Sequence, residues 1–393
     1  MTRDACRTRL AEAYAAADFV VVEGAFESDA SGLVDRDFCC PGDVGGSLDV
    51  LCRRLDLPRL VVLDASTVED CRFPSRPEVV DGVLLDGVDA IDVYARLQTS
   101  LEGAWGVPVV GGLLRSPELA RQIAKASPTS PVPREVCERL IADFAKLVDE
   151  RAIDVLAART TIPAVAGEAK SEPCTTSNRC PPTVAVAFDD AFCGYFPESL
   201  ESLERGGAKV VDFSPLSHES LPEQTDVVLV GCGRPDRYAA ELSANHCLKA
   251  ALRDFARRGG RIYAEGGGLA YLGRWLTGAD GRDYPMLDLF PFAARRARSA
   301  AAPLAVEFRT NDDSWLIPAD TACRAYRDFA WTFDALCSVD HLTLAADDLW
   351  RIGDLIGGRL QLHLAAQPRL LERLFLPHRP AAFARPLDSG RVL

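Results

Sequence analysis

The chain has 393 residues, of which 48% are apolar and 26% charged, and this length and composition indicate two ordinary globular domains. Its net charge of −13 excludes a nucleic-acid backbone as the partner, because that partner requires a basic surface. No apolar run approaches the roughly 20 residues of a membrane-spanning helix. The charged N-terminus also lacks the apolar segment of a signal peptide, so we expect a cytoplasmic protein without membrane contact.

Residues 1–160 alternate strand-like and helix-like segments. Segment 136–148 has the apolar spacing of a helix, and Cys6–Ala17 places its apolar residues on one helical face. Such alternation predicts a parallel α/β sheet. Its strands should be the short β-branched runs, which are typical of strands buried on both faces: Phe19–Val22, Leu60–Leu63, Val83–Leu85 and Val107–Val110.

Residues 161–182 are rich in Thr, Pro, Ser and Ala, and this composition predicts a linker between two domains. The second domain is expected to span 183–393. It begins with strands expected at 184–187, 209–213, 227–230 and 261–264 and with helices near 196–205 and 239–257. This order predicts a flavodoxin-like sheet, whereas residues 285–393 show only fragments of a pattern.

The thirteen cysteines form no disulfide or metal-binding pattern. Their number is odd, no pair has the two-residue spacing of a zinc knuckle, and nothing in the sequence indicates secretion. We therefore expect most of them to be small buried thiols.

The strand expected at 261–264 leads into three consecutive glycines, Gly266–Gly268. A tight turn between a strand and a helix carries the nucleophile beneath an oxyanion hole in many α/β enzymes. Here the turn has no side chain that could attack a substrate. The apolar residues after it are spaced as one helix face: Leu269, Leu272, Trp275 and Leu276.

The segment Ala264–Leu272 resembles the Glu-Cys-Gly-Gly-Leu-Met-Tyr-Leu turn of the cobyrinic acid a,c-diamide synthases, a family of class I glutamine amidotransferases in cobalamin biosynthesis. Further segments resemble that family's glutaminase domain, so that the resemblance covers 183–276: Ala185–Leu200, Phe213–Pro222, Val230–Asp236 and Ala240–Asn245. Short segments resemble the second half of the family's ATP-using domain, a P-loop-type sheet like that of dethiobiotin synthetase, which would be truncated here: Phe19–Gly24, Leu63–Ala65 and Gly82–Val88.

The resemblance implies an ATP-dependent ligase. One domain would release ammonia from glutamine, and the other would activate tetrapyrrole carboxylates with Mg-ATP for amidation. Family members begin with a P-loop ending in Gly-Lys-Thr or Gly-Lys-Ser, which holds the nucleotide phosphates, and this chain has no such sequence. Glu23 matches a family position that implies a Mg²⁺ ligand, and the alternative is a polar residue at a strand end.

Glutamine hydrolysis requires a thiolate nucleophile, a histidine base and an oxyanion hole. By the resemblance, Gly233 and Gly267 keep the backbone of the oxyanion hole, but Gly266 stands at the position of the nucleophilic cysteine. Cys232 takes a glycine position in a neighbouring loop, and we do not expect it to replace that nucleophile.

The family's histidines are mostly absent. Its Ser-Tyr-x-His-x-His-Phe segment aligns with a stretch in which Gln361 replaces one histidine and His363 remains as the candidate base. The alternation of His363 with Leu362 and Leu364 favours a residue on a strand surface instead. The family's Gly-His-Glu-Phe-His-Tyr-Ser segment aligns with Tyr326–Thr332, where both histidines are missing.

Three interpretations remain open. The chain is a catalytically impaired member of the family, or it is a noncatalytic binding or regulatory subunit with a tetrapyrrole or glutamine pocket. Such a subunit would partner a P-loop-containing chain or form a homo-oligomer, because loss of the P-loop strand leaves open sheet edges. In the third interpretation the P-loop lies upstream of Met1, which leaves Gly266 unexplained.

Overall fold

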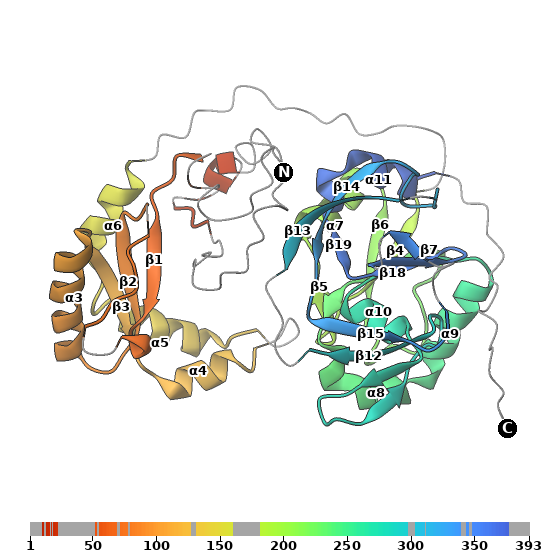
Figure 1. The fold of residues 1–393 in the computed structure, drawn as a ribbon, viewed down its shortest axis with the longest axis horizontal. Coiled ribbons are helices and arrows are strands. Elements are labelled where there is room, and N and C mark those ends of the chain that lie inside the picture. The colour runs from red at the N-terminus through yellow and green to blue at the C-terminus, as the bar shows by residue number, and fades with distance from the viewer. Residues whose placement is uncertain are drawn as a thin grey trace. The chain divides into compact units, whose positions relative to one another are not determined.

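The computed structural model describes most of residues 10–22 and residues 52–159, 181–297 and 303–376, apart from short gaps at 53–54, 69–70, 78, 127–130, 311, 339–342 and 346–347. The chain forms two compact units, Met1–Ala169 and Lys170–Leu393 (Figure 1). The expected linker at 161–182 lies almost entirely outside the described residues and stays a prediction. Among the described helices, none is long and apolar enough to cross a membrane.

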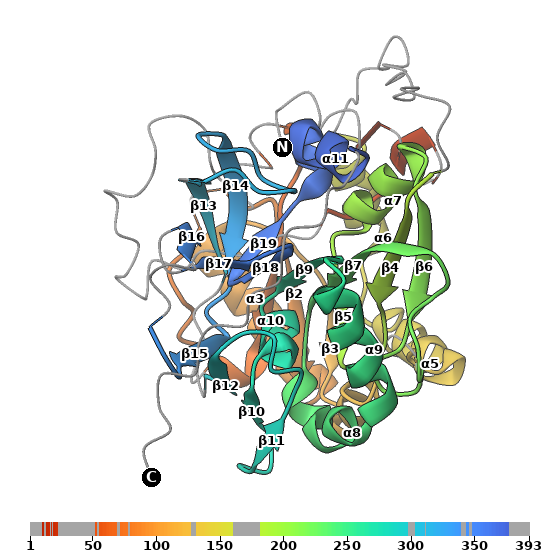
Figure 2. The same cartoon turned by 90° about the vertical axis from the view of Figure 1, so that its right-hand side faces the viewer.

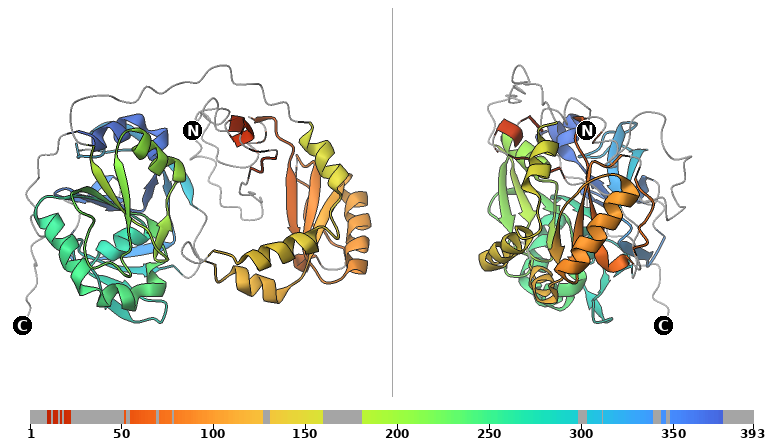
Figure 3. Two further views of the ribbon diagram at one scale, coloured as in Figure 1. Left: turned by 180° about the vertical axis from the view of Figure 1, so that it is seen from behind. Right: turned by 90° about the vertical axis from the view of Figure 1, so that its left-hand side faces the viewer.

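The first unit contains a parallel sheet in the order β1-β2-β3, formed by β1 (Leu60–Asp64), β2 (Gly82–Val88) and β3 (Val109–Leu114). Three of the four expected strands are thereby confirmed. Helix α3 (Ile91–Trp105) lies along one face of this sheet (Figure 3), because its apolar residues recur at helical spacing and share one core with β2 and β3. This unit also contains α4 (Pro117–Ile123), α5 (Arg134–Phe144), α6 (Glu150–Ala157) and the short helix η3 (Ala65–Thr67). Leu10, Ala11 and residues 13–15 are helical, in agreement with the helical pattern of Cys6–Ala17.

The strand expected at Phe19–Val22 is wrong. These residues have no regular secondary structure, and Phe19 and Val21 are exposed. β-Branched residues favour a strand, but a strand forms only where a neighbouring strand can pair with it. No strand among the described residues pairs with this segment. One side of β1 pairs with β2, and no described residue pairs with its other side.

The second unit is built on a seven-stranded sheet in the order β16-β17-β18-β9-β7-β4-β6. Five neighbouring strands are parallel: β18 (Leu355–Gly358), β9 (Arg261–Glu265), β7 (Thr225–Val230), β4 (Thr183–Ala187) and β6 (Lys209–Phe213). Their chain order across the sheet is the flavodoxin-like one, and the four expected strands are confirmed. The two antiparallel strands at the edge are β17 (Leu349–Ile352) and β16 (Thr343–Ala345).

Helices cover both faces of this sheet (Figure 2). Helices α7 (Pro197–Arg205) and α11 (Pro368–Leu374) share a core with Val184 and Val186, which point to one face of β4. The alternate residues of β4 lie in a second core together with α9 (His246–Arg257) and α10 (Gly267–Leu272). Successive side chains of β4 point to opposite faces of the sheet, so this one strand contributes to both cores.

The helix expected at 239–257 is interrupted. Asn245 separates α8 (Ala239–Ala244) from α9, because its side chain accepts the Leu248 N–H at 3.2 Å and caps the second helix.

The helix expected to continue through Leu276 is wrong. Helix α10 ends at Leu272, and a β-carbon on Gly273 would lie 3.0 Å from the Phe292 carbonyl oxygen, so the chain approaches another strand there. Trp275 and Leu276 instead pair within a small sheet of β10 (Trp275–Thr277), β11 (Asp283–Pro285), β12 (Phe292–Arg296) and β15 (Trp331–Ala335). Another small sheet contains β13 (Leu304–Arg309), β14 (Ala322–Arg327) and β19 (Leu360–Leu362).

Candidate active site at the glycine turn

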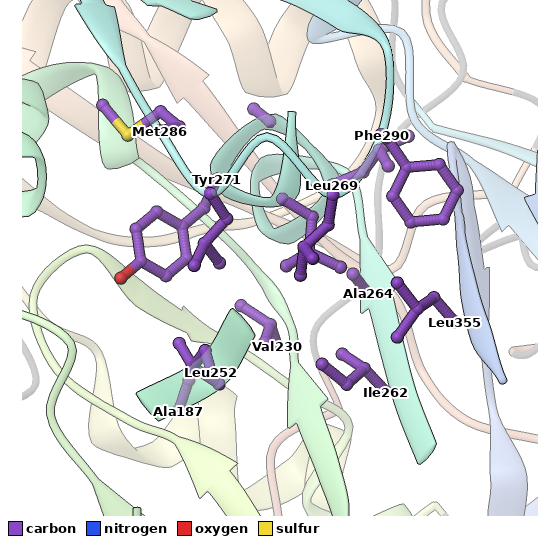
Figure 4. Packing of buried hydrophobic residues seen from close by; sticks show 14 of the residues in the cluster. Ala187, Val230, Leu252, Ile262, Ala264, Leu269, Tyr271, Met286, Phe290 and Leu355 are labelled. Atoms are coloured by element: carbon purple, nitrogen blue, oxygen red, sulfur yellow. The ribbon is translucent and has the colours of Figure 1, made fainter. Parts of the chain in front are cut away.

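The glycine turn after β9 is held in the core. Gly266 has φ +49° and ψ −107°, in the left-handed region that favours glycine. Its N–H donates to the Gly358 carbonyl oxygen at 2.8 Å, and its carbonyl oxygen accepts the Ala270 N–H at 3.2 Å. Every residue of α10 is buried, and Leu269 lies among apolar side chains of β9 and β18 (Figure 4). The main chain therefore keeps the strained turn on which α/β enzymes present a nucleophile.

Three side chains from other segments fill the space beside Gly266. A β-carbon placed on Gly266 would lie 2.9 Å from Asp328 Oδ2, 3.1 Å from Cys232 Sγ and 3.6 Å from Trp331 Cδ1. Asp328 is fixed in place because its Oδ1 accepts the Ala330 N–H at 2.7 Å. A side chain at position 266 therefore requires Asp328 to move.

Cys232 lies in β8 (Cys232–Gly233), which pairs with β5 (Phe192–Gly194). Burial raises the pKa of its thiol well above the ordinary value, and the nearby Glu265 and Asp328 carboxylates raise it further. Because the thiolate is the nucleophilic form, this environment opposes a role of Cys232 as the nucleophile in glutamine hydrolysis. Sequence reasoning missed that its Sγ lies against the nucleophile position, since no spacing in the chain signals a contact between these two loops.

We expect the variant Gly266→Cys to form a disulfide bond with Cys232. The 3.1 Å between the β-carbon position and Sγ matches the separation across a disulfide, about 3 Å for an S–S bond of about 2.0 Å. Oxidised glutathione should consume both thiols, and peptide mapping before and after reduction should find the two peptides linked. The matched variant Gly266→Cys/Cys232→Ser cannot form this link. Two thiols that remain free in Gly266→Cys would contradict the placement of Sγ.

Gly233 and Gly267, the residues expected to line an oxyanion hole, lie side by side. A β-carbon on Gly267 would lie 3.1 Å from the Gly233 carbonyl oxygen and 3.2 Å from the Gly233 nitrogen. One on Gly268 would lie 2.1 Å from the Val230 carbonyl oxygen. Only glycine lets the two backbones approach this closely. The turn thus keeps a tightly packed backbone cradle, and its use as an oxyanion hole stays a prediction.

Gln361, which replaces a family histidine, lies close to this site. It belongs to β19, and its Nε2 donates to the Gly194 carbonyl oxygen at 3.3 Å. Gly194 pairs with Cys232, so the amide of Gln361 lies one strand away from that thiol. An amide cannot act as the general base that glutamine hydrolysis needs.

His363, the candidate base, is not on a strand surface as expected. It begins the short helix η6 (Leu364–Ala366), where its Nδ1 accepts the Ala366 N–H at 3.2 Å. Its ring also packs on Phe196 with centroids 4.7 Å apart, and its Nε2 lies 3.8 Å from a Glu198 carboxylate oxygen. The hydrogen bond to Nδ1 occupies a lone pair that a general base would need, and the role of His363 in catalysis stays a prediction.

Glu265, directly before the turn, is a buried carboxyl that sequence reasoning did not single out. It is 7% exposed, and its Oε1 accepts the Leu362 N–H at 2.7 Å. Burial raises the pKa of this carboxyl to about 8, although its hydrogen bonds act in the opposite direction. The neighbouring Tyr263 hydroxyl donates to the Leu360 carbonyl oxygen at 3.0 Å. Both side chains thereby join β9 to β19.

A cavity of about 30 Å³ lies beside Glu265 and α7. Its polar lining comes from Tyr195, Ser199, Gly231, Tyr263 and Glu265, and the rest of the wall is apolar. No sequence signal pointed to it, because its walls come from segments far apart in the chain.

The expected metal ligand, Glu23, lies outside the described residues. Within the described ranges, no group of three or more His, Cys, Asp or Glu side chains is arranged to hold a metal ion.

Comparison with known proteins gives consistent matches. Residues 183–302 match the model of the CobB/CobQ-like glutamine amidotransferase domain. The chain is 32% identical over 305 residues to the cobyrinate a,c-diamide synthase of Syntrophotalea carbinolica, which covers 74% of this chain and 63% of that protein. It is 27% identical over 393 residues to the cobyrinate a,c-diamide synthase of Salmonella typhimurium, which covers 91% of this chain and 80% of that protein.

The hydrogenobyrinate a,c-diamide synthase of Brucella abortus is 31% identical over 269 residues, which cover 65% of this chain and 60% of that protein. The chain thus spans less than two thirds of the length of several of these relatives. A crystal structure of a glutamine amidotransferase matches 49% of this chain and 99% of its own, with 15% identity and a TM-score of 0.38.

Proposed function

This chain belongs to the cobyrinate a,c-diamide synthase family, and from that premise we propose that it serves corrinoid (cobalamin) biosynthesis with an amidotransferase domain that does not hydrolyse glutamine. The observation that carries this proposal is Gly266 at the nucleophile position, with Asp328 and Cys232 filling the space that a nucleophile would need.

The chemistry of the surrounding groups supports the proposal. Hydrolysis of an amide by this route needs a thiolate, a base to activate it and an oxyanion hole. The raised pKa of the Cys232 thiol opposes thiolate formation. Gln361 offers no proton acceptor of the required kind. Only the backbone cradle at Gly233 and Gly267 persists. The direct test is the rate at which the purified chain releases glutamate from glutamine.

The family reaction, ATP-dependent amidation of tetrapyrrole carboxylates, remains a proposal for the whole protein. The residues at hand do not fit Mg-ATP, since the sequence holds no Gly-Lys-Thr or Gly-Lys-Ser loop. The described residues also supply no cluster of metal ligands. The proposed function therefore includes no step that uses ATP.

A second candidate function is a noncatalytic binding or regulatory subunit that associates with a P-loop-containing chain or with a second copy of itself. The observation that favours it is β1, whose outer side pairs with no described residue and whose Val62 is 64% exposed. Open strand edges are templates for pairing with another chain.

If the second candidate is right, we expect the full chain to be at least a dimer, or to bind a P-loop-containing partner, through β1. A lysine at an edge strand opposes such pairing, so Val62→Lys should give a monomer. Ile141→Lys on α5 is the matched control, because Ile141 is similarly exposed but lies on a helix. Light scattering should separate the two variants. A wild-type monomer that captures no partner, or a dimer insensitive to Val62→Lys, would exclude this edge as the interface.

A further inference from the structure

The cavity beside Glu265 is large enough for one small ligand. Its volume of about 30 Å³ exceeds the roughly 10–15 Å³ that a single water needs. Glu265 is more than nine-tenths buried, and its carboxyl lines the wall. The cavity is therefore a built site with a buried carboxyl in its lining, which becomes a carboxylate above about pH 8.

The polar groups around this cavity offer mainly acceptor sites. A carboxylate has about four lone-pair positions, and those of Glu265 receive the Leu362 N–H and a hydrogen bond from the Tyr263 hydroxyl, which leaves about two positions for a ligand. The Tyr195 hydroxyl donates its proton to the Ala187 carbonyl oxygen at 2.6 Å and accepts the Gly231 N–H at 2.8 Å. The Tyr263 hydroxyl likewise donates to the Leu360 carbonyl oxygen. Because these protons are already used, a ligand that donates hydrogen bonds or carries positive charge fits best.

The charges that act on this region are of one sign. The pKa of Tyr195 is raised by burial and by Glu265, Cys232 and Asp189, and that of Cys232 by burial and by acidic groups including Asp328. Burial and the same carboxyl, Glu265, also raise the pKa of Tyr263.

The His363 ring packs on Phe196, which lines the cavity, and its Nε2 lies 3.8 Å from a Glu198 carboxylate oxygen. No Lys, Arg or His is among the charged groups that act on these residues in the described part of the chain.

We propose that this cavity binds a small monovalent cation of the size of ammonium, held by the Glu265 carboxylate and the hydroxyl oxygen of Tyr195. One carboxylate suits a single positive charge, whereas Ca²⁺ needs six to eight oxygen ligands, usually several of them carboxylates. The existence of a cation site is argued from the cavity and its lining. The choice of ammonium as its occupant rests on the proposed function. A domain that cannot release ammonia from glutamine would then bind free ammonium beside the glycine turn at Gly266.

The test compares unfolding by urea in ammonium, potassium, sodium and lithium chloride at equal ionic strength and pH 8.5. At ten times the dissociation constant, ammonium should lower the unfolding equilibrium constant about tenfold relative to lithium. The effect should vanish at pH 5.5, where Glu265 is protonated. It should also vanish in Glu265→Gln, which keeps an acceptor for the Leu362 N–H. Glu204→Gln, an exposed carboxylate on α7, is the matched control and should behave as wild type.

Each outcome decides the proposal. Stabilisation by ammonium alone, or by ammonium and potassium, supports the site and tells whether it selects ammonium. Equal effects of all four cations, an effect that survives in Glu265→Gln, or no effect at all would overturn it. None of these results depends on glutamine hydrolysis, so the proposed function is tested separately.

Discussion

Purified protein is expected to release no glutamate from glutamine above the rate in buffer. Removing the nucleophile from a catalytic triad lowers turnover by roughly 10⁶-fold, and the oxyanion hole and substrate binding alone leave a residual acceleration of roughly 10³-fold over water. Gly266 has no side chain to attack, and the pKa of the Cys232 thiol is raised well above its ordinary value. A coupled glutamate assay at high protein concentration measures this rate. Turnover that disappears in Cys232→Ser would contradict the expectation.

Restoring the nucleophile alone should also fail. In Gly266→Cys the new β-carbon would lie 2.9 Å from Asp328 Oδ2 and 3.1 Å from Cys232 Sγ. Gln361 would still leave the base position unfilled. The triple variant Gly266→Cys/Cys232→Gly/Gln361→His removes the competing thiol and supplies a base, so it should show the first detectable turnover. Equal activity in the single variant would mean that neither Cys232 nor Gln361 limits the site.

Glu265→Gln should change how stability depends on pH. The carboxyl has a pKa of about 8 in the folded chain against 4.5 ordinarily, so the folded state favours its protonated form. Its contribution is fully present below pH 4.5 and is lost as pH rises through 8. The loss is on the order of 5 kcal/mol, from about 1.4 kcal/mol per pKa unit over the rise from 4.5 to about 8. The variant should therefore match wild type near pH 5 and exceed it above pH 8.

Urea unfolding in lithium chloride between pH 5 and 9 measures this difference. Lithium avoids any stabilising cation, and Glu204→Gln controls for loss of an exposed carboxylate. The Leu362 N–H keeps its partner in Glu265→Gln, because the amide oxygen is also an acceptor. Parallel curves for wild type and Glu265→Gln would show that the carboxyl titrates normally in the folded chain.

The parallel sheet of the second unit could be predicted from sequence because its strands are buried on both faces. Each of β4, β7 and β9 is a short apolar run, and burial on both faces leaves no alternative environment for such a run. The glycine turn followed from Gly266–Gly268, since consecutive glycines at the end of a buried strand indicate a tight turn. The resemblance then supplied the roles expected of Gly233 and Gly267.

The contents of the site could not be predicted in the same way. Cys232, Asp328 and Trp331 converge on Gly266 from separate strands and loops, and their order in the chain carries no sign of that contact. Trp275 had helical spacing, but pairing in β10 overrode it. The raised pKa of Glu265 arises from burial by distant segments, which a local pattern cannot reveal.

The measurement that tests the central claim most directly is intact-protein mass spectrometry after incubation with a diazoketone analogue of glutamine. Such an analogue alkylates a thiolate that lies beside a working glutamine site and requires no ATP or acceptor substrate. The structure predicts no adduct on the wild-type chain, because Gly266 leaves the nucleophile position without a thiol and the pKa of Cys232 is raised. A single stoichiometric adduct that maps to Cys232, is prevented by glutamine and is lost in Cys232→Ser would contradict the account.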